Sequence, residues 1–370
     1  MKDRKPTFII ISPGFARDEK DSACLPAQQV FVNTLNKNYP ELNIIILALE
    51  YPFIKSTYQW NGNTVVSFNG WGKGKLKKIF NWISVWRALN KLKQQHNIIG
   101  IISFWCTQAT LIGSYFAKHN HLINYSWILG QDAKKENKYV KWIRPKANEL
   151  IALSDFMAMD FYKNHLVLPN HIIPLGINAD LFSKENNTRD IDILGAGSLI
   201  PLKQYELFIE LIAQLKNNFS TIKVVLCGKG PEEKKLKQLI INLGLENNIS
   251  LVGEKPHAEV LKMMQRTKIF LHPSSYEGFG MVCIEALGAG AHVISFCKPM
   301  ADAILHWHIA KNKNDMLQRT IALLQNDTLN HLPVIPYPSD ECAKKIMHLF
   351  NYHTPEILKP IAAAHANEYN

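Results

Sequence analysis

Residues 272–294 read HPSSYEGFGMVCIEALGAGAHVI, and this stretch decides the fold class of the chain. One apolar run precedes it and another ends it, so the pattern predicts a strand, a glycine turn, a helix and a second strand. A helix that begins near Phe279 directs its free backbone N–H groups at the turn, where an anion can bind. Glu277 is expected just before that helix, and Glu285 about two turns inside it on the same side.

This stretch resembles the paired-glutamate motif of retaining GT-B glycosyltransferases, especially glycosyltransferase family four. The family pattern is Glu-Gly-Phe-Gly, a second Glu, an alanine-rich helix and a small-residue turn, and all of it is present in order. The resemblance implies that Glu277 faces the sugar of a donor and Glu285 holds its ribose. The diphosphate would lie between them, against the turn and helix end formed by Gly278, Phe279, Gly280 and Met281. An ordinary α/β unit with two incidental glutamates does not explain the motif together with the eight-residue offset.

Bulk properties indicate a globular chain of two domains. The 370 residues are too many for one small core, and the hydrophobic and charged contents of 47% and 20% are ordinary. No apolar run is long enough to span a membrane, and the first apolar run predicts a strand rather than a signal sequence. The six cysteines are scattered without a Cys-x-x-Cys pattern, so we expect a reduced, cytoplasmic protein with no metal site.

Apolar runs alternate with helical stretches, which predicts α/β architecture with parallel sheets. With right-handed crossovers this gives Rossmann-like domains, and the family resemblance implies the GT-B fold, two such domains facing across a cleft. The polar run 183–190 marks the boundary, so we expect an acceptor-side domain at 1–183 and a nucleotide-sugar domain at 184–370. By analogy with the fold, a terminal helix within 355–369 would pack back on the first domain. The expected strands are Phe8–Ser12, Asn43–Leu49, Ile98–Phe104, Tyr125–Leu129, Leu150–Leu153, Ile172–Leu175, Ile191–Gly195, Lys223–Cys227, Ile249–Val252, Ile269–Leu271 and Val293–Ser295.

The start of the second domain resembles the family's phosphate-clamping loop, in which Arg and Lys hold the diphosphate. Here Ser198 stands where Arg is usual, while Lys203 is kept. A dinucleotide site is disfavoured because the third glycine of that fingerprint is missing. The weaker clamp means that the helix end must carry more of the phosphate charge.

Three further glycines resemble family positions beside the nucleotide. Gly228 and Gly230 belong to a strand-Gly-x-Gly-Pro-Glu turn, where glycines let the backbone approach a ligand closely. Gly253 ends a short strand whose following backbone edge would meet the base. A contact made mainly by backbone cannot distinguish bases, so the expected donor is a UDP- or GDP-sugar.

The resemblance implies retaining sugar transfer without a metal or other cofactor. Charge develops on the β-phosphate oxygen as the glycosidic bond stretches, and Lys203, Ser198 and the amides near Phe279–Met281 would stabilise it. The ring becomes oxocarbenium-like, and Glu277 would hold the sugar hydroxyls and orient that ring.

The acceptor half matches the family less closely. Gly14 ends the first strand where the family has a glycine-bearing loop facing the donor. Many members place a catalytic-region histidine at the strand end where this chain has Gly130-Gln131-Asp132. We assign Asp132 as the polar replacement; the alternative is that Asp132 caps the next helix. Ser154 matches the family's serine after the following strand.

The charge of the chain is unevenly placed. Residues 1–185 hold 23 Lys+Arg and 13 Asp+Glu, whereas residues 186–370 hold 19 and 18. Such a basic half indicates an anionic partner, either a membrane leaflet, a lipid-linked phosphate or an acidic glycan, or else a solubilising surface. Within it, residues 71–93 predict a basic amphipathic helix, which could cover the first sheet, lie on an anionic membrane, or do both. No nucleic-acid-binding motif accompanies it.

The expected function is hexosyl transfer from a nucleotide sugar to a glycan or lipid-linked acceptor, as in cell-surface polysaccharide or glycolipid synthesis. The expected location is the cytoplasm, with peripheral contact to the inner leaflet. Two alternatives stay open, a non-catalytic sugar-nucleotide-binding subunit and a phosphorylase-like transferase.

Overall fold

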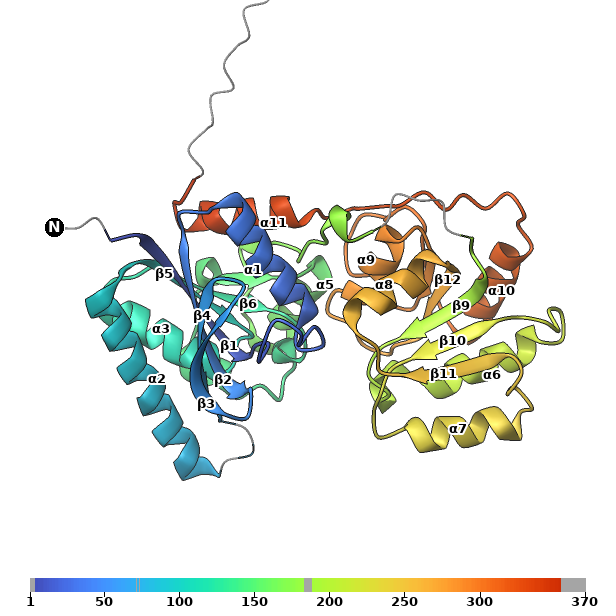
Figure 1. Ribbon diagram of the computed structural model, residues 1–370, viewed down its shortest axis with the longest axis horizontal. Helices are drawn as coiled ribbons and strands as arrows, with labels where there is room; N and C mark the ends of the chain where they lie inside the picture. The colour runs from blue at the N-terminus through green and yellow to red at the C-terminus, as the bar shows by residue number, and fades with distance from the viewer. Residues whose placement is uncertain (1–3, 71, 73, 183–187, 354–370) are drawn as a thin grey trace, which may run out of the picture.

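The computed structural model describes residues 4–70, 72, 74–182 and 188–353, which form two sheets side by side (Figure 1). The first sheet has eight strands in the order β3-β4-β2-β1-β5-β6-β7-β8, all parallel except the β3–β4 pair. Its strands are β1 (Pro6–Gly14), β2 (Asn43–Tyr51), β3 (Lys55–Trp60), β4 (Asn63–Phe68), β5 (Asn97–Phe104), β6 (Asn124–Ile128), β7 (Leu150–Ala152) and β8 (His171–Ile172).

The second sheet has six parallel strands in the order β11-β10-β9-β12-β13-β14. They are β9 (Ile191–Ala196), β10 (Val224–Cys227), β11 (Ile249–Gly253), β12 (Thr267–His272), β13 (His292–Ser295) and β14 (Trp307–Ile309). Strand order reverses between β9 and β12, and ligands of open parallel sheets bind outside the carboxyl ends of the strands at such a point. The prediction of two Rossmann-like α/β domains is therefore confirmed.

Helices cover the sheets because parallel strands need crossover connections. In the second domain, α6, α7 and α10 pack one buried apolar cluster on the outer face, while α8 and α9 lie on the side nearer the first domain (Figure 1). The helices are α1 (Pro26–Asn38), α2 (Lys75–Gln95), α3 (Gln108–Asn120), α4 (Tyr139–Ile143), α5 (Asp155–His165), α6 (Tyr205–Leu215), α7 (Glu233–Asn242), α8 (His257–Gln265), α9 (Met281–Gly288), α10 (Lys313–Leu324) and α11 (Ser339–Leu349).

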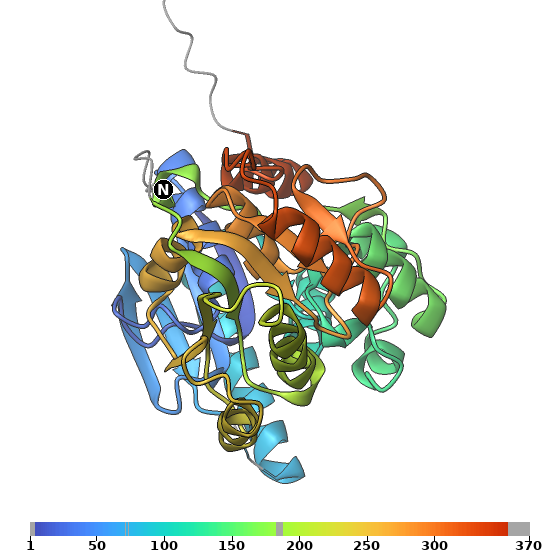
Figure 2. The same cartoon turned by 90° about the vertical axis from the view of Figure 1, so that its right-hand side faces the viewer.

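The chain returns to the first domain at its end. Helix α11 packs against α1, and the ring of Phe350 lies 4.8 Å from that of Phe8 on β1. Both views show α11 at the top of the molecule beside the N-terminal helix α1 (Figures 1 and 2). The helix expected within 355–369 lies outside the described residues, as do residues 183–187 at the expected boundary, so both stay predictions.

Every expected strand has a counterpart, although the strand expected at Ile172–Leu175 is only His171–Ile172, and β3, β4 and β14 were missed. Strands β3 and β4 form an antiparallel hairpin around Asn61 and Gly62, whose φ values of 44° and 78° fit a two-residue turn. Asn-Gly between apolar runs is the strongest short-range signal for such a hairpin, so this element was readable from the sequence. Helix α2 covers the first sheet with buried Val85 and Leu89, which confirms its crossover role.

Histidines gather at the start of β13. The His292 ring stacks on His306 at 4.2 Å, and its Nδ1 lies 3.1 Å from Nε2 of His308. Burial lowers the pKa of His292 from 6.5 to about 4, and it also lowers the pKa values of His306, His308 and His331. The folded protein therefore keeps these rings neutral at a pH where the unfolded chain takes up protons.

This cluster predicts a loss of stability in mild acid. As the pH falls from above 6.5 to about 4, protons bind the unfolded chain preferentially, so the free energy of unfolding decreases. His292→Gln removes one of these titrating groups. The free energy of unfolding should then change less steeply with pH, by up to about 1.4 kcal/mol per pH unit. Urea unfolding at several pH values measures the slope, and the exposed-site variant His119→Gln should keep it. An unchanged slope in His292→Gln contradicts the assignment.

Candidate active site

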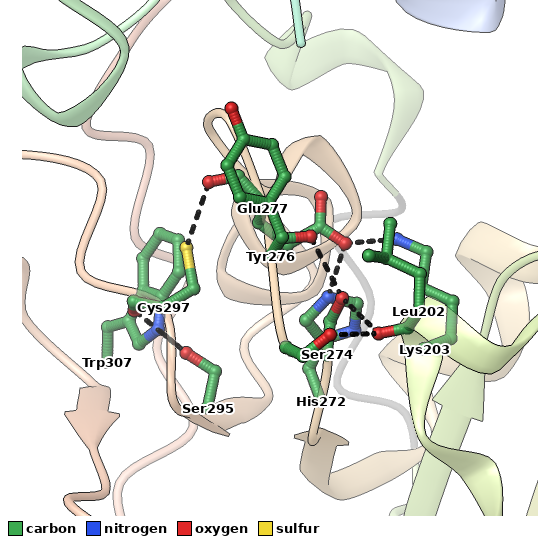
Figure 3. A network of polar contacts seen from close by, with 10 residues as sticks. Leu202, Lys203, His272, Ser274, Tyr276, Glu277, Ser295, Cys297 and Trp307 are labelled. Atoms are coloured by element: carbon green, nitrogen blue, oxygen red, sulfur yellow. Dashed lines mark hydrogen bonds and ion pairs between the residues drawn. The ribbon is translucent and has the colours of Figure 1, made fainter. Parts of the chain in front are cut away.

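One carboxylate at the end of β12 is shared by two side chains from different loops. Glu277 Oε1 lies 2.9 Å from Nε2 of His272, the last residue of β12, and forms an ion pair with Lys203 (Figure 3). Lys203 ends a short helical turn after β9. The carbonyl of Leu202 binds the backbone N–H of Ser275 at 3.0 Å and its hydroxyl at 3.1 Å, which fixes Lys203 beside Glu277.

The protonation states follow from burial and pairing. Burial alone would raise the pKa of Glu277, but the hydrogen bond from His272 and the ammonium of Lys203 lower it to about 2. Burial lowers the pKa of His272, although Glu277 opposes this. Because Glu277 is a carboxylate and can only accept, the neutral His272 ring donates its Nε2–H to it. The site therefore holds one buried anion, one cation and one neutral donor.

The second acid of the motif lies in a separate setting. Glu285 is 8% exposed on the second turn of α9, and its Oε1 lies 2.8 Å from Nε2 of His257 at the start of α8. Burial would lower the pKa of His257, but the hydrogen bond and charge of Glu285 raise it. Helix α9 begins at Met281, so Glu285 sits little more than one turn inside it, closer to the helix end than we expected.

A cavity of 470 Å³ opens between the two domains beside Glu285. The first domain contributes the segment before α1 together with Leu129, and the second contributes Ser198, Gly228, Met281, Val282 and His257. Cys283 and Ile284 bond their N–H groups to Gly280, so the amides of Met281 and Val282 remain at the open end of α9. A helix end with free amides facing a cavity can hold an anion.

Two cations that the sequence did not single out also line this cavity. They are Lys229, which lies between Gly228 and Gly230, and Lys255, which follows β11. They follow the carboxyl ends of β10 and β11, which lie in succession on one side of β9, and parallel strands deliver their following loops to one edge of the sheet. They place positive charge in the cavity that Ser198 cannot supply.

The fold is shared with solved glycosyltransferases. TarM aligns with a TM-score of 0.70 over 94% of this chain and 99% of that chain, at 14% sequence identity. HepE from Anabaena in complex with UDP-glucose aligns with a TM-score of 0.65 over 93% of this chain and 97% of that chain, at 15% identity. At such identities the likeness establishes the GT-B fold and nothing finer.

The family model described as "Glycosyl transferases group 1" matches residues 177–332, which contain both glutamates and Lys203. This segment of the chain belongs to the group 1 glycosyltransferases. The phosphatidylinositol N-acetylglucosaminyltransferase gpi3 subunit of Schizosaccharomyces pombe is 26% identical over 242 residues, 63% of this chain and 53% of that protein. The MMP alpha-(1->4)-mannosyltransferase of Mycolicibacterium hassiacum is 27% identical over 154 residues, 40% and 36%. The matches thus span about half or less of these relatives.

The predicted glycines mostly serve packing between loops. A Cβ on Gly228 would lie 1.9 Å from the carbonyl oxygen of Gly197, and one on Gly230 would lie 2.3 Å from that of Leu199. The close approach is therefore made by another strand-end loop, although Gly228 also lines the cavity. Gly253 accepts a hydrogen bond from the Gly228 N–H at 2.9 Å, which aligns the two loops.

Around the motif turn, Gly280 takes the left-handed conformation, with φ 75°, that starts α9. Phe279 is buried, with its ring 5.4 Å from that of Tyr337. Both residues support the turn from its buried side. Of the predicted turn residues, Met281 is the one that lines the cavity.

Asp132 lies in the first domain with its carboxylate turned onto the backbone. Its oxygens accept N–H groups from Cys106 at 2.8 Å, Gly130 at 2.8 Å and Leu129 at 3.2 Å. Burial raises the pKa of Asp132 to about 6, although these hydrogen bonds lower it. Asp132 lies inside the short turn Gln131–Ala133, whose cap is Gly130, so it does not have the helix-capping role given as the alternative but organises the loop. A direct catalytic role stays a prediction. Gly14 ends β1 against Tyr51 and does not line the cavity.

The motif loop is also held by the first domain. Ser154 Oγ donates to the carbonyl of Gly278 at 2.5 Å, and the Tyr276 hydroxyl donates to Asp160 Oδ2 on α5 at 2.8 Å. These contacts lie on either side of Glu277 in sequence. The position of the acid therefore depends on how the two domains meet.

The ion pair between Lys203 and Glu277 predicts that Lys203 contributes to the stability of the fold. Lys203→Met should lower the free energy of unfolding by about 2 kcal/mol, because it leaves a largely buried carboxylate without its cation. The double variant Lys203→Met/Glu277→Gln should recover at least half of that loss. Urea unfolding at pH 7 measures both. Lys235→Met, which removes an exposed ion pair with Glu206, should change little. A double variant as unstable as the single one contradicts the argument.

Proposed function

We propose that the protein transfers a hexose-type sugar from a UDP-sugar to a glycan or lipid-linked acceptor, with retention of the anomeric configuration. The observation that carries the proposal is that the two motif acids lie on either side of the start of α9, and that Glu285 lines the interdomain cavity. Solved neighbours bound to UDP or UDP-glucose support uracil over guanine as the donor base.

In the proposed reaction the nucleoside diphosphate lies against the amides of Met281 and Val282. Charge that develops on the leaving phosphate is stabilised by these amides and by the ammonium groups of Lys203 and Lys229. Lys203 has three N–H donors, so it can hold Glu277 and a phosphate oxygen together. This neutralises a carboxylate that would otherwise repel the diphosphate.

Each acid then has its own task. Glu277, ionised and fixed by His272, accepts hydrogen bonds from sugar hydroxyls and orients the ring as it becomes oxocarbenium-like. Glu285 accepts the ribose hydroxyls, and His257 holds the carboxylate in place from its other side. The acceptor enters from the first domain, whose residues form the opposite wall of the cavity.

Contact with an anionic membrane surface is part of the proposal. Ile79, Phe80 and Ile83 near the start of α2 are 49%, 67% and 42% exposed, and Lys78 directly precedes them in sequence. Apolar and basic residues together favour an interfacial helix. Within the described residues, no helix is long and apolar enough to cross a bilayer. Flotation with anionic vesicles tests this contact.

Donor binding tests the proposal directly. A UDP-sugar at about 100 times its dissociation constant should stabilise the fold by about 2.7 kcal/mol, seen as a higher melting temperature than without ligand. A GDP-sugar at the same concentration should give a smaller shift. Lys229→Ala should reduce the UDP-sugar shift, and the exposed Lys223→Ala should not. No shift with any nucleotide sugar rejects the proposal.

The two acids should fail in different ways. In donor hydrolysis, measured as UDP release, Glu277→Ala should lower kcat by about a hundredfold, because sugar orientation matters in the transition state. Glu285→Ala should mainly raise the donor KM, by about tenfold or more, through loss of hydrogen bonds to a charged group. The first-formed sugar should keep the donor's anomeric configuration by NMR. Glu254→Ala, at an exposed carboxylate of the same cavity, is the matched control.

Binding without any hydrolysis in the unaltered protein would favour the non-catalytic subunit instead. Full activity in both acid variants would remove the assigned roles.

A further inference from the structure

A second hollow lies on the first domain, away from the cavity between the domains. Its volume is 770 Å³, and it is formed by the end of α3, the start of β6 and the segment 141–149. Asn124 begins β6 and lines this hollow, whereas Leu129, just after the strand, lines the interdomain cavity. Five residues of strand separate them by about 16 Å. The hollow therefore lies at the amino ends of the strands of the first sheet, and the proposed reaction takes place at their carboxyl ends.

The rim of this hollow is strongly basic. Four exposed cations line it: Lys118, Lys141, Arg144 and Lys146. None of them forms an ion pair with any other residue that the structure describes. The single acid of the lining, Glu149, is turned onto the backbone, where its Oε2 accepts the N–H of Lys146 at 3.0 Å.

Two aromatic rings stand exposed among these cations. Trp142 is 54% exposed and Tyr115 is 52% exposed, and both line the hollow. They are held in place, because the Tyr115 hydroxyl donates to the Trp142 carbonyl at 3.1 Å and the Trp142 ring packs edge-on against Tyr139 at 5.5 Å. Large aromatic faces left in water at fixed positions mark interaction sites rather than core.

The floor adds polar groups. Asn124 lines the hollow, and its Oδ1 is buried without a hydrogen-bond partner among the described residues, which leaves an unused acceptor there. Asn148 lines the hollow as well. Hydroxyl-binding amides, ring-binding aromatics and anion-binding cations thus occur together in one depression.

We propose that this hollow is a second carbohydrate site, which binds an anionic glycan chain. Sugar rings present C–H faces that pack on Trp142 and Tyr115, and carboxylate or phosphate groups on the chain pair with the cations, Arg144 in bidentate fashion. A bare anion would use the cations but not the aromatic faces, and a neutral glycan would use the aromatic faces but not the cations. The site would hold a segment of the acceptor chain while the end of that chain reaches the cleft.

Binding is measured on the full chain without donor, so the result does not depend on the proposed transfer activity. The probes are an oligogalacturonate, neutral maltohexaose and inorganic polyphosphate, compared by calorimetry in physiological salt. Oligogalacturonate should bind at least tenfold tighter than either of the others. Lys118→Glu/Lys141→Glu should weaken it at least tenfold, and Trp142→Ala severalfold in both low and high salt.

The matched control is Lys234→Glu/Lys237→Glu, which makes the same charge change on exposed residues of α7 in the other domain. It should leave oligogalacturonate binding unchanged, and circular dichroism should show all variants folded. Equal weakening by the control pair, equal affinity for polyphosphate, or no effect of Trp142→Ala overturns the proposal. It is also overturned if Lys118→Glu/Lys141→Glu abolishes binding to phosphatidylglycerol vesicles and leaves oligogalacturonate binding intact.

Discussion

The shared carboxylate of Glu277 is the constraint on which the site depends. A buried anion at the end of a parallel strand is costly unless it is paired and hydrogen-bonded. Here the cation comes from the loop after β9 and the neutral donor from β12 itself. Meeting that requirement joins the loops at the carboxyl ends of two adjacent strands. The turn that starts α9 follows Glu277 directly in sequence, so this contact also fixes the position of the cavity wall that α9 forms.

Topology explains why these residues meet although 74 positions separate Lys203 from Glu277. Strands β9 and β12 are parallel neighbours in the order β10-β9-β12-β13, so the loops that follow them leave the sheet at the same edge and can contact each other. Loops from β10 and β11 reach the same edge and bring Lys229 and Lys255. The loss of an arginine at Ser198 is therefore compatible with anion binding, because neighbouring loops place cations at the same edge.

The sequence predicted what is local and repeated, and missed what depends on distant partners. Glu277, the helix start and Glu285 follow from spacing within one stretch, and the apolar runs gave every expected strand. The partners His272 and His257 were not predicted, because only the fold shows which ring nitrogen faces which carboxylate. Gly228 was assigned correctly to a turn, but its close contact is with Gly197 rather than with a ligand alone. The hairpin around Asn61 was missed although its signal was present.

Contacts across the domains could not be read from any motif, yet they decide how the site works. Tyr276 and Gly278 flank Glu277 in sequence, and both are held by the first domain, through Asp160 and Ser154. A rotation of one domain against the other would break these hydrogen bonds and free the loop that carries the acid. The same loop holds Lys203 through Glu277, so domain opening also changes the cation available to a diphosphate. The proposed donor contacts therefore depend on how the two domains meet, because the loop that carries Glu277 is held by both of them.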